Sequence, residues 1–264
     1  MLPDAASNDR YVYDIVVIVL VGVASGTLNA IGGGGTFVAL PALVAFGVPP
    51  VAANAVSRIA LAPGAVASAW VARRDAAPLG GTSTRALTAV SVVGGALGAV
   101  LLLALPSESF DAALPWLLLF ATLLLAFGGR LSLLIARAAG EDAVLGPRAV
   151  LAGQFVLALY GGYFGGAVGI LMMALWSVGL RLDAAAGNPM RLVQLAAIYL
   201  GAGALFLFVP DVRGNLPLLL GMLAGAVAGG WAGAHLARRL SARLLKGSIL
   251  TVAATTTTLY FLAA

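Results

Sequence analysis

The chain has 264 residues, of which 61% are hydrophobic and only 9% are charged. Soluble domains usually carry about 25% charged residues, so this composition excludes a soluble protein and indicates an integral membrane protein. The formal net charge of +5 does not imply a nucleic-acid partner, because basic residues collect in the cytoplasmic loops of membrane proteins. The absence of cysteine and the single histidine exclude disulfides, thiol catalysis and a histidine-cluster metal site, and we expect no cofactor.

Residues 1–14 precede the first apolar run, and we predict that they form an extracytoplasmic tail. This segment contains three acidic residues and one arginine, which does not match the basic start of a secretory signal peptide. We therefore expect the first apolar segment to be retained.

The apolar stretches fall into two classes by length. Six are suited to one membrane crossing each, which needs about 20 residues. Two further runs, 15–47 and 149–180, are too long for one span and too short for two, and glycine interrupts both, in "NAIGGGG" (29–35) and "YGGYFGGAVG" (160–169). We predict that each long run forms a re-entrant hairpin of two half-helices that turns at mid-membrane. The single spans are predicted at 54–72, 86–105, 112–128, 190–209, 216–236 and 247–263.

The distribution of basic residues supports the hairpins and gives an orientation. With both long runs re-entrant and the N-terminus outside, eleven basic residues lie in inner loops and two in outer segments. If all eight segments were simple spans, the better orientation would leave eight against five, with "RRLSARLLK" (238–246) outside. The positive-inside rule therefore favours the hairpins, with both termini outside. The four tryptophans, at positions 70, 116, 176 and 231, lie near segment ends, as expected for interfacial belts.

The second half repeats the first about 133–136 positions later. "SGTLNAIGGGGTFVALPALVAFGV" and then "AANAVSR" correspond to "GGYFGGAVGILMMALWSVGL" and then "AAGNPMR". We predict an all-α polytopic membrane protein of two repeats, 15–128 and 149–264, joined by a cytoplasmic linker at 129–148. Each repeat is a broken, re-entrant hairpin followed by three spans. Because each repeat makes an odd number of crossings, the two are inverted, as is common in secondary transporters.

The two glycine-rich breaks are candidate sites for an anion. Non-helical backbone at membrane depth is tolerated only where it is buried in protein or lines a watery cavity, and helix N-termini offer free N–H groups and partial positive charge. The alternative is that the glycines only allow close helix packing, the role that we assign to "VVGGALGAV" (92–100) and "GMLAGAVAGGWAGA" (221–234). The candidate glycines at the breaks are Gly32, Gly33, Gly34, Gly35, Gly165, Gly166 and Gly169.

Arg58 and Arg191 are the only basic residues outside the loops and tails, and they occupy matching places in the two halves. Charges inside a membrane are costly and indicate function by default. Two roles remain open for each arginine. It either contacts the anion directly, or it has a structural role, snorkelling to the nearer interface or bonding to exposed carbonyls of the hairpin.

Polar side chains next to the arginines and the first break complete the candidate site. Those near Arg58 are spaced i, i+3 and i+4 and share its helix face, and a comparable stripe accompanies Arg191. The asparagines of these stripes act either as helix N-caps or as ligands, and the two polar residues flanking the first break bond either to ligand or to freed backbone. The candidates are Asn29, Thr36, Asn54, Ser57, Asn188 and Gln194.

Several kinds of site are not supported by the sequence. No aspartate or glutamate lies deep in a predicted span, which argues against a cation site or a buried carboxylate proton relay. The "GGGG" stretch lacks the Gly-Lys-Ser/Thr that a phosphate-binding P-loop requires. No serine has a histidine and an acid plausibly nearby, and no carboxylate pair is set for acid/base work. We therefore expect a protein that is not an enzyme and whose substrate is an anion.

The duplicated pattern resembles the sulfite exporter TauE/SafE family, also called the toluene sulfonate uptake permease family. The resemblance lies in "SGTLNAIGGGGTFVALPALVAFGVPPVAANAVSRIA" and its second copy "GGYFGGAVGILMMALWSVGLRLDAAAGNPMRL", and length and segment count extend it over nearly the whole chain. It implies transport of a small anion, such as sulfite, a sulfonate or sulfoacetate, across a bacterial inner membrane. The chain departs from the family pattern at the four glycines, at "GAVG" and at "NPM", which stands where Thr-Asn or Thr-Lys is frequent. Those departures leave the identity of the anion open.

We therefore expect a secondary transporter that works by alternating access, with the anion held between the two breaks near mid-membrane. Its expected partners are the anion and membrane lipid, and a homodimer is compatible with the sequence. One alternative is an anion channel of the same shape, which would pass current instead of showing saturation and counterflow. Another is a membrane assembly factor without transport activity, which would need a sizeable partner-binding loop.

Overall fold

The computed structural model of the chain describes residues 5–138, 144–236 and 242–263. Within these residues the chain forms eleven α-helices and no β-sheet, with one isolated bridge between Leu79 and Thr82. Six helices contain a stretch long and apolar enough to cross a membrane. The prediction of an all-helical, multi-pass membrane protein is therefore confirmed. The predicted cytoplasmic cluster at 238–246 lies partly outside the described residues.

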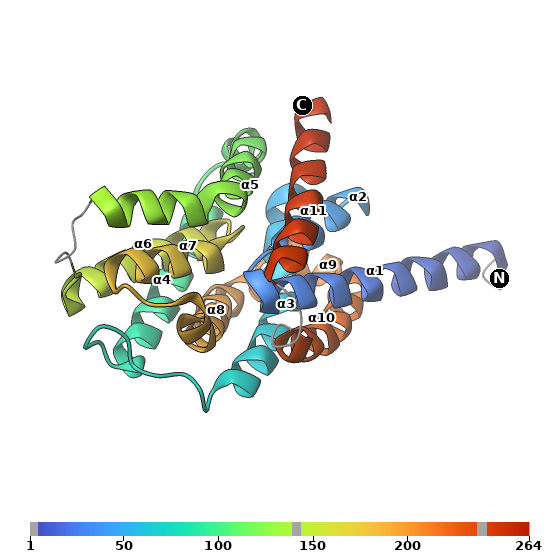
Figure 1. Cartoon of the computed structure of the whole chain (residues 1–264). Coiled ribbons are helices and arrows are strands. Elements are labelled where there is room, and N and C mark those ends of the chain that lie inside the picture. Colours follow the sequence, from blue (N-terminus) through green and yellow to red (C-terminus); the bar gives the residue numbers. More distant parts are fainter. Residues whose placement is uncertain (1–4, 139–143, 237–241, 264) are drawn as a thin grey trace.

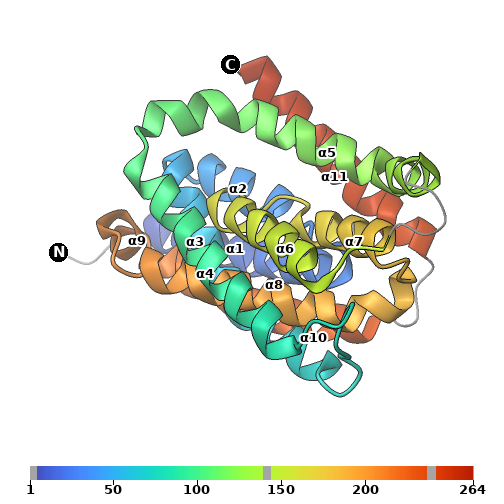
Figure 2. The ribbon, with the colours of Figure 1, turned by 90° about the vertical axis from the view of Figure 1, so that its left-hand side faces the viewer.

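The helices of the two halves follow the same order (Figures 1 and 2). The first half contains α1 (Ala5–Gly32), α2 (Thr36–Ala45), α3 (Pro50–Ala72), α4 (Thr84–Ala104) and α5 (Ser107–Ala138). The second half contains α6 (Pro147–Tyr163), α7 (Val168–Gly179), α8 (Ala184–Phe206), α9 (Pro210–Gly214), α10 (Leu216–Leu236) and α11 (Ala242–Ala263). The short α9 is the only one of these without a counterpart in the first half of the described chain. The apolar part of α11, Ile249–Leu262, is too short to count among the six candidate spans, so the span predicted at 247–263 is a helix but not one of the six.

Each long apolar run is divided into two helices at its glycine-rich stretch. In the second run, α6 and α7 have 17 and 12 residues, as two half-helices would. In the first run, α2 has 10 residues, but α1 has 28. The apolar part of α1, Tyr13–Gly32, has 20 residues, enough for a full crossing. The prediction of two half-helices therefore fits the second run better than the first. Helix α1 also begins within the predicted tail, and its N-terminal part extends away from the other helices (Figure 1).

Both breaks begin with a glycine in the left-handed conformation. Gly33 has φ +75° and donates its amide to the Asn29 carbonyl at 2.9 Å. Gly165 has φ +76° and donates to the Tyr160 carbonyl at 3.1 Å. A left-handed glycine after the last helical turn is a common way to end a helix. In the second break Ala167 is also left-handed, with φ +57°, a conformation that costs a non-glycine residue roughly 1–2 kcal/mol.

Helices α3 and α8 lie at the centre of the molecule. In their most apolar windows 67% and 72% of the residues are buried, against 33–39% in the other four candidate spans. The two helices pack against each other, α4 packs on α6 and α8, and α10 packs on α1 and α3. Helices α5 and α11 contact each other on one side of the bundle (Figures 1 and 2). If α1–α5 are matched with α6, α7, α8, α10 and α11, each of these contacts has a counterpart in the other half.

The glycine-rich faces of α4 and α10 allow close approach of backbones. A Cβ atom added at Gly98 would lie 2.1 Å from the Leu159 carbonyl oxygen of α6. In α10, a Cβ at Gly229 would lie 2.1 Å from the Val23 carbonyl oxygen of α1. The packing role predicted for these two glycine-rich segments is therefore confirmed, and it agrees with small-residue helix interfaces in membranes.

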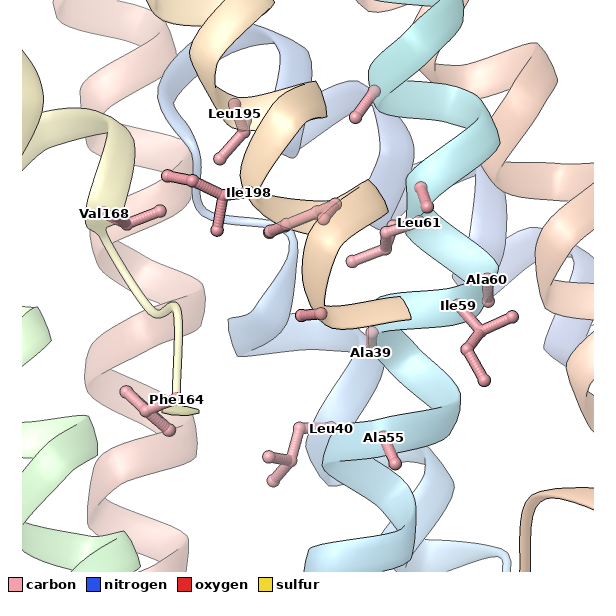
Figure 3. Packing of buried hydrophobic residues seen from close by; sticks show 14 of the residues in the cluster. Ala39, Leu40, Ala55, Ile59, Ala60, Leu61, Phe164, Val168, Leu195 and Ile198 are labelled. Atoms are coloured by element: carbon pink, nitrogen blue, oxygen red, sulfur yellow. The ribbon is translucent and has the colours of Figure 1, made fainter. Parts of the chain in front are cut away.

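The apolar core joins the breaks to the central helices. In Figure 3, Val168 at the start of α7 lies beside Ile198 of α8, and Phe164 of the second break and Leu40 of α2 belong to the same buried cluster. All four side chains are fully buried. Packing of this density positions the backbone of both breaks relative to α3 and α8.

One predicted interfacial anchor is wrong. Trp70, Trp116 and Trp231 are 57–65% exposed, but Trp176 is completely buried. It lies in α7, which packs against α5, α6 and α8. A tryptophan on a short helix enclosed by its neighbours cannot reach a membrane interface.

Candidate functional site

The two breaks meet inside the molecule. A Cβ atom added at Gly33 would lie 3.0 Å from the backbone nitrogen of Gly169 and 3.1 Å from its Cα. A Cβ added at Gly169 would in turn lie 3.4 Å from the Cα of Gly33. Only glycine allows the backbone of the first break to approach the first turn of α7 this closely.

Arg191 joins the end of α1 to α8. Its Nη2 donates to the carbonyls of Ala30 at 2.7 Å and Ile31 at 3.1 Å, while Nε and Nη2 donate to Asn188 Oδ1 at 3.0 and 2.7 Å. The two carbonyls belong to the last turn of α1, where a helix lacks internal donors and carries partial negative charge. Arg191 is 2% exposed, so it does not snorkel to an interface. It bonds to the first break region, at the end of α1, which belongs to the other half of the chain.

One nitrogen of Arg191 remains without an acceptor. Nη1 is buried and has no hydrogen-bond partner in the described structure. It lies beside both breaks, 2.9 Å from the position that a Cβ of Gly169 would occupy and 3.8 Å from that of Gly33. The free N–H groups of this nitrogen therefore lie where the two breaks converge.

Arg58 is less constrained than Arg191. It is fully buried, and among the described residues its hydrogen bond to Asn54 is a long one, 3.4 Å from Nη2 to Oδ1. Its guanidinium carbon lies 4.9 Å from the centre of the Tyr199 ring, within range of a cation–π contact. Nε and Nη1 have no partner among the described residues. A Cβ at Gly165 would lie 2.2–2.3 Å from three guanidinium atoms, so Arg58 lies directly against the second break.

Each arginine thus contacts the broken helix of the other half. Arg58, in the first half, lies against the break of the second half, and Arg191 bonds to the end of α1 in the first half. Asn54 also contacts the other half, since its Nδ2 donates to the Tyr163 carbonyl at the end of α6 at 2.7 Å. Each central helix therefore carries polar groups that bond to, or lie against, the broken helix of the other half.

The N-cap role considered for the two asparagines is wrong. Helix α3 has Pro49 at its N-cap and begins at Pro50, and proline is favoured at this first helical position. Helix α8 is capped by Asp183, whose carboxylate accepts a hydrogen bond from the Ala185 amide at 3.1 Å. Both helices begin several residues before their asparagine, so Asn54 and Asn188 lie within helices and contact the breaks and arginines instead.

Polar groups also surround the first break. Asn29 is buried and accepts a hydrogen bond from the Tyr199 hydroxyl at 3.0 Å. The hydroxyls of Thr36 and Ser25 are buried without a partner in the described structure. Gly35 packs against this part of α1, where a Cβ would lie 2.5 Å from the Ser25 carbonyl oxygen and 2.8 Å from Asn29 Cβ.

Three other candidate glycines do not face the arginines. Gly32 and Gly34 face Ile249 of α11, whose side chain would lie 2.8 and 2.6 Å from a Cβ at each position. Gly166 accepts a hydrogen bond from the Tyr160 hydroxyl at 2.8 Å through its carbonyl. The side chains nearest these glycines are therefore apolar or aromatic.

Two predicted polar side chains form contacts elsewhere. The Ser57 hydroxyl donates to the Asn54 carbonyl of its own helix at 2.8 Å. Gln194 accepts from the Ser91 hydroxyl at 2.9 Å, and Ser91 in turn accepts from Gln154 Nε2 at 2.9 Å. Gln194 thus belongs to a buried polar cluster between α4, α6 and α8, and no hydrogen bond of its side chain involves either break.

Free backbone amides mark the N-terminal ends of α2 and α7. The amides of Gly35 and Thr36 in the first break, and of Gly166, Ala167 and Gly169 in the second, donate no hydrogen bond within the described structure. Unsatisfied N–H groups at helix N-termini carry partial positive charge and bind anions. Free amides and two buried guanidinium groups therefore gather at the breaks.

Tyr199 and Ser25 were not among the predicted site residues. Tyr199 touches both Arg58 and Asn29, and it follows Asn188 by eleven residues, about three helical turns, which places both on nearly the same helix face. Ser25 precedes Asn29 by one turn. Helical spacing from the predicted residues could have identified both.

A comparison with protein-family models gives a match for this chain. The family model described as "Sulfite exporter TauE/SafE" matches residues 18–260. That range includes both breaks and both buried arginines. No curated protein matches the chain in sequence.

Proposed function

The chain belongs to the sulfite exporter TauE/SafE family, and on this premise we propose how it binds and moves its substrate. The family consists of membrane transporters for sulfite- or sulfonate-type substrates, not of enzymes. We propose that this protein is a secondary carrier for a small sulfur-containing anion, such as sulfite, a sulfonate or sulfoacetate, and that it works by alternating access.

The observation that carries the proposal is the convergence of unpaired donors on both breaks. Arg58 Nε and Nη1 and Arg191 Nη1 are buried without acceptors, and they lie against Gly165 and Gly169. Buried polar groups are almost always hydrogen-bonded, because an unpaired one is costly. Guanidinium groups form strong, directional bonds to oxyanions. A bound oxyanion would supply the acceptors that these donors lack, and the free amides of α2 and α7 would contribute to its binding.

We assign the primary contacts to Arg58, Arg191 and the backbone at Gly33, Gly165 and Gly169. Their geometry supports both roles considered for the arginines. Arg191 bonds to the end of α1 through Nε and Nη2 and keeps Nη1 for the anion. Asn29 and Thr36, which are buried beside the first break, would line the path next to these contacts.

We propose that the two repeats are inverted, as the odd number of predicted crossings in each implies, and the contacts between the halves have the two-fold correspondence that such repeats require. Each half packs its first helix on the fourth transmembrane element of the other half, as α1 does on α10 and α6 on α4. In inverted-repeat carriers one repeat rocks against the other around a central site. Here Arg58 and Arg191 lie between a central helix of one half and the break of the other, so such a motion would alter their contacts. We propose that this coupling links anion binding to alternating access.

The orientation in the membrane remains a prediction from the charge distribution. We expect both termini on the extracytoplasmic side and residues 129–148 on the cytoplasmic side. Because the chain lacks cysteine, single cysteines can be labelled without background. Arg74→Cys, in an exposed loop, should react only from the cytoplasm, and Gly214→Cys only from outside. Labelling of both from the same side would refute the orientation.

Transport by purified protein in liposomes tests the proposed function. Liposomes preloaded with unlabelled sulfite or sulfoacetate should take up the labelled anion by counterflow, with saturation. Arg74→Gln, at an exposed position, is a matched control that should behave as wild type, whereas Arg58→Gln should lose most of the flux. Anion current without saturation or counterflow would identify a channel, and no anion flux of either kind would refute the proposal.

A further inference from the structure

We propose that the site selects doubly charged anions over singly charged ones of closely related structure. This inference rests on the proposed function and adds the charge of the substrate to it. It follows from the charges buried around the two breaks, which the sulfur chemistry of the family does not specify.

Two positive charges are buried at the site without a buried acid. Arg58 and Arg191 are 0% and 2% exposed. Every aspartate or glutamate whose exposure the structure describes is either exposed or half-buried. Their neighbours are neutral: Asn54 and Tyr199 for Arg58, and Asn188 and two backbone carbonyls for Arg191. The described interior therefore carries a formal charge of +2.

The partial charges of the helix ends around the site do not change the formal charge of +2. The N-terminal ends of α2 and α7 contribute partial positive charge, and the C-terminal ends of α1 and α6 contribute partial negative charge. All four ends lie at the breaks. Because two ends of each sign are present, their contributions oppose each other. The guanidinium groups therefore determine the net charge that a ligand meets.

A doubly charged anion would neutralise the site, whereas a singly charged one would leave one buried positive charge uncompensated. Charges interact strongly in a low-dielectric interior, and an unpaired buried charge is costly. The unpaired nitrogens also come from two directions, two from Arg58 and one from Arg191. A dianion can place negative charge near both guanidinium groups. Chloride carries one charge, and on this argument it would compete weakly.

A pair of ligands that differ in one charge tests the inference. Sulfoacetate carries a sulfonate and a carboxylate, and its methyl carboxylate ester keeps the sulfonate but loses the second charge. We expect wild-type protein in detergent to bind sulfoacetate roughly ten- to a hundredfold more tightly than the ester, as measured by calorimetry, since one charge-assisted contact is lost. Chloride in excess should displace sulfoacetate poorly.

Sulfite provides a second test that needs no variant. Its second ionisation falls near neutral pH, so the dianion fraction rises as the pH rises through that range. The apparent affinity for total sulfite should rise in parallel and then level off. Sulfoacetate is doubly charged throughout the same range, and its affinity should stay constant. If the affinities for both ligands changed with pH in the same way, a group on the protein would be titrating. That result would contradict the inference that the site selects ligands by their charge.

Arg58→Gln should reduce the preference for sulfoacetate over its ester, because the site then carries one positive charge. The exposed Arg74→Gln variant should keep the full preference. Equal affinity of wild-type protein for sulfoacetate and its ester would overturn the inference while leaving an anion carrier intact. If wild type binds neither ligand and shows no sulfite counterflow, the proposed function fails together with the inference.

Discussion

Arg58 and Arg191 occupy matching positions in the two halves, but their surroundings differ. Arg191 forms four hydrogen bonds of 2.7–3.1 Å, two of them to the end of α1. Within the described residues, Arg58 forms a long bond of 3.4 Å to Asn54 and leaves Nε and Nη1 without acceptors. Matching sequence positions therefore do not imply matching roles. We infer that Arg191 mainly holds a broken helix in place, whereas Arg58 is mainly available to the anion.

The difference has a local cause. At the end of α1 the carbonyls of Ala30 and Ile31 are free to accept from Arg191. At the end of α6 the Tyr163 carbonyl is already bonded to Asn54 at 2.7 Å. Asn54 thus takes the place at the second break that the arginine side chain takes at the first, and Arg58 is left against Gly165.

The largest expected effect is that of Arg191→Ala on stability. It would leave the Ala30 and Ile31 carbonyls without their donor, and we expect a loss of about 2–4 kcal/mol in the free energy of unfolding. Arg58→Ala is the matched comparison and should cost clearly less, because fewer bonds are lost. Denaturant titration of both variants in detergent measures this. Equal losses would show that the two arginines have the same structural role.

Gly165→Ala should abolish transport by displacing Arg58. The added Cβ would lie 2.2 Å from the guanidinium group, at a residue with φ +76°. Gly47→Ala is a matched control, because Gly47 has φ +84° but nothing within 4 Å of the added Cβ. Both variants carry backbone strain of about 1–2 kcal/mol, and only the first meets the arginine. Similar flux in liposomes for both variants would mean that the contact with Arg58 is unimportant.

A smaller effect is expected for Tyr199→Phe. It removes the hydroxyl that donates to Asn29 at 3.0 Å but keeps the ring next to Arg58. We expect a loss of about 0.5–1.5 kcal/mol in stability and a modest loss of anion affinity. Thermal unfolding with and without sulfoacetate separates the two effects. Tyr199→Leu should weaken binding further, because it also removes the ring.

The smallest effect is expected for Ser57→Ala. Among the described residues its hydroxyl bonds to the Asn54 carbonyl of the same helix, a bond that contributes little to a helix. Anion affinity and flux should stay close to wild type. A large loss of affinity would show that Ser57 turns toward the anion in a state other than the one described here.

Much of the fold could be predicted from the sequence because it depends on local patterns. Long apolar stretches identified the membrane helices, and interruptions such as "NAIGGGG" identified both breaks. The glycine-rich faces of α4 and α10 were recognised because small residues are typical of close helix packing in membranes. Helix starts were predicted less well. Helix α8 is capped by Asp183 and α3 begins at Pro50, so both start before the asparagines that we had considered as caps.

The site could be predicted only in part. The presence of Arg58 and Arg191 in apolar segments indicated function, because such charges are costly there. Which break each arginine would contact could not be predicted, since it depends on how two halves more than a hundred residues apart pack together. The burial of Trp176 and the bonding of Gln194 to Ser91 depend on the same packing. Hydropathy and residue spacing contain no information about how the two halves pack against each other.

The central claim is that the anion binds between Arg58 and Arg191 where the two breaks meet. Anomalous diffraction from crystals grown with selenite, the selenium analogue of sulfite, tests it most directly, because the chain has no thiol that selenite could oxidise. We predict one strong selenium peak within hydrogen-bonding reach of Arg58 Nη1, Arg191 Nη1 and the Gly169 amide. A selenium peak elsewhere in the protein, with none at this position, would contradict the account.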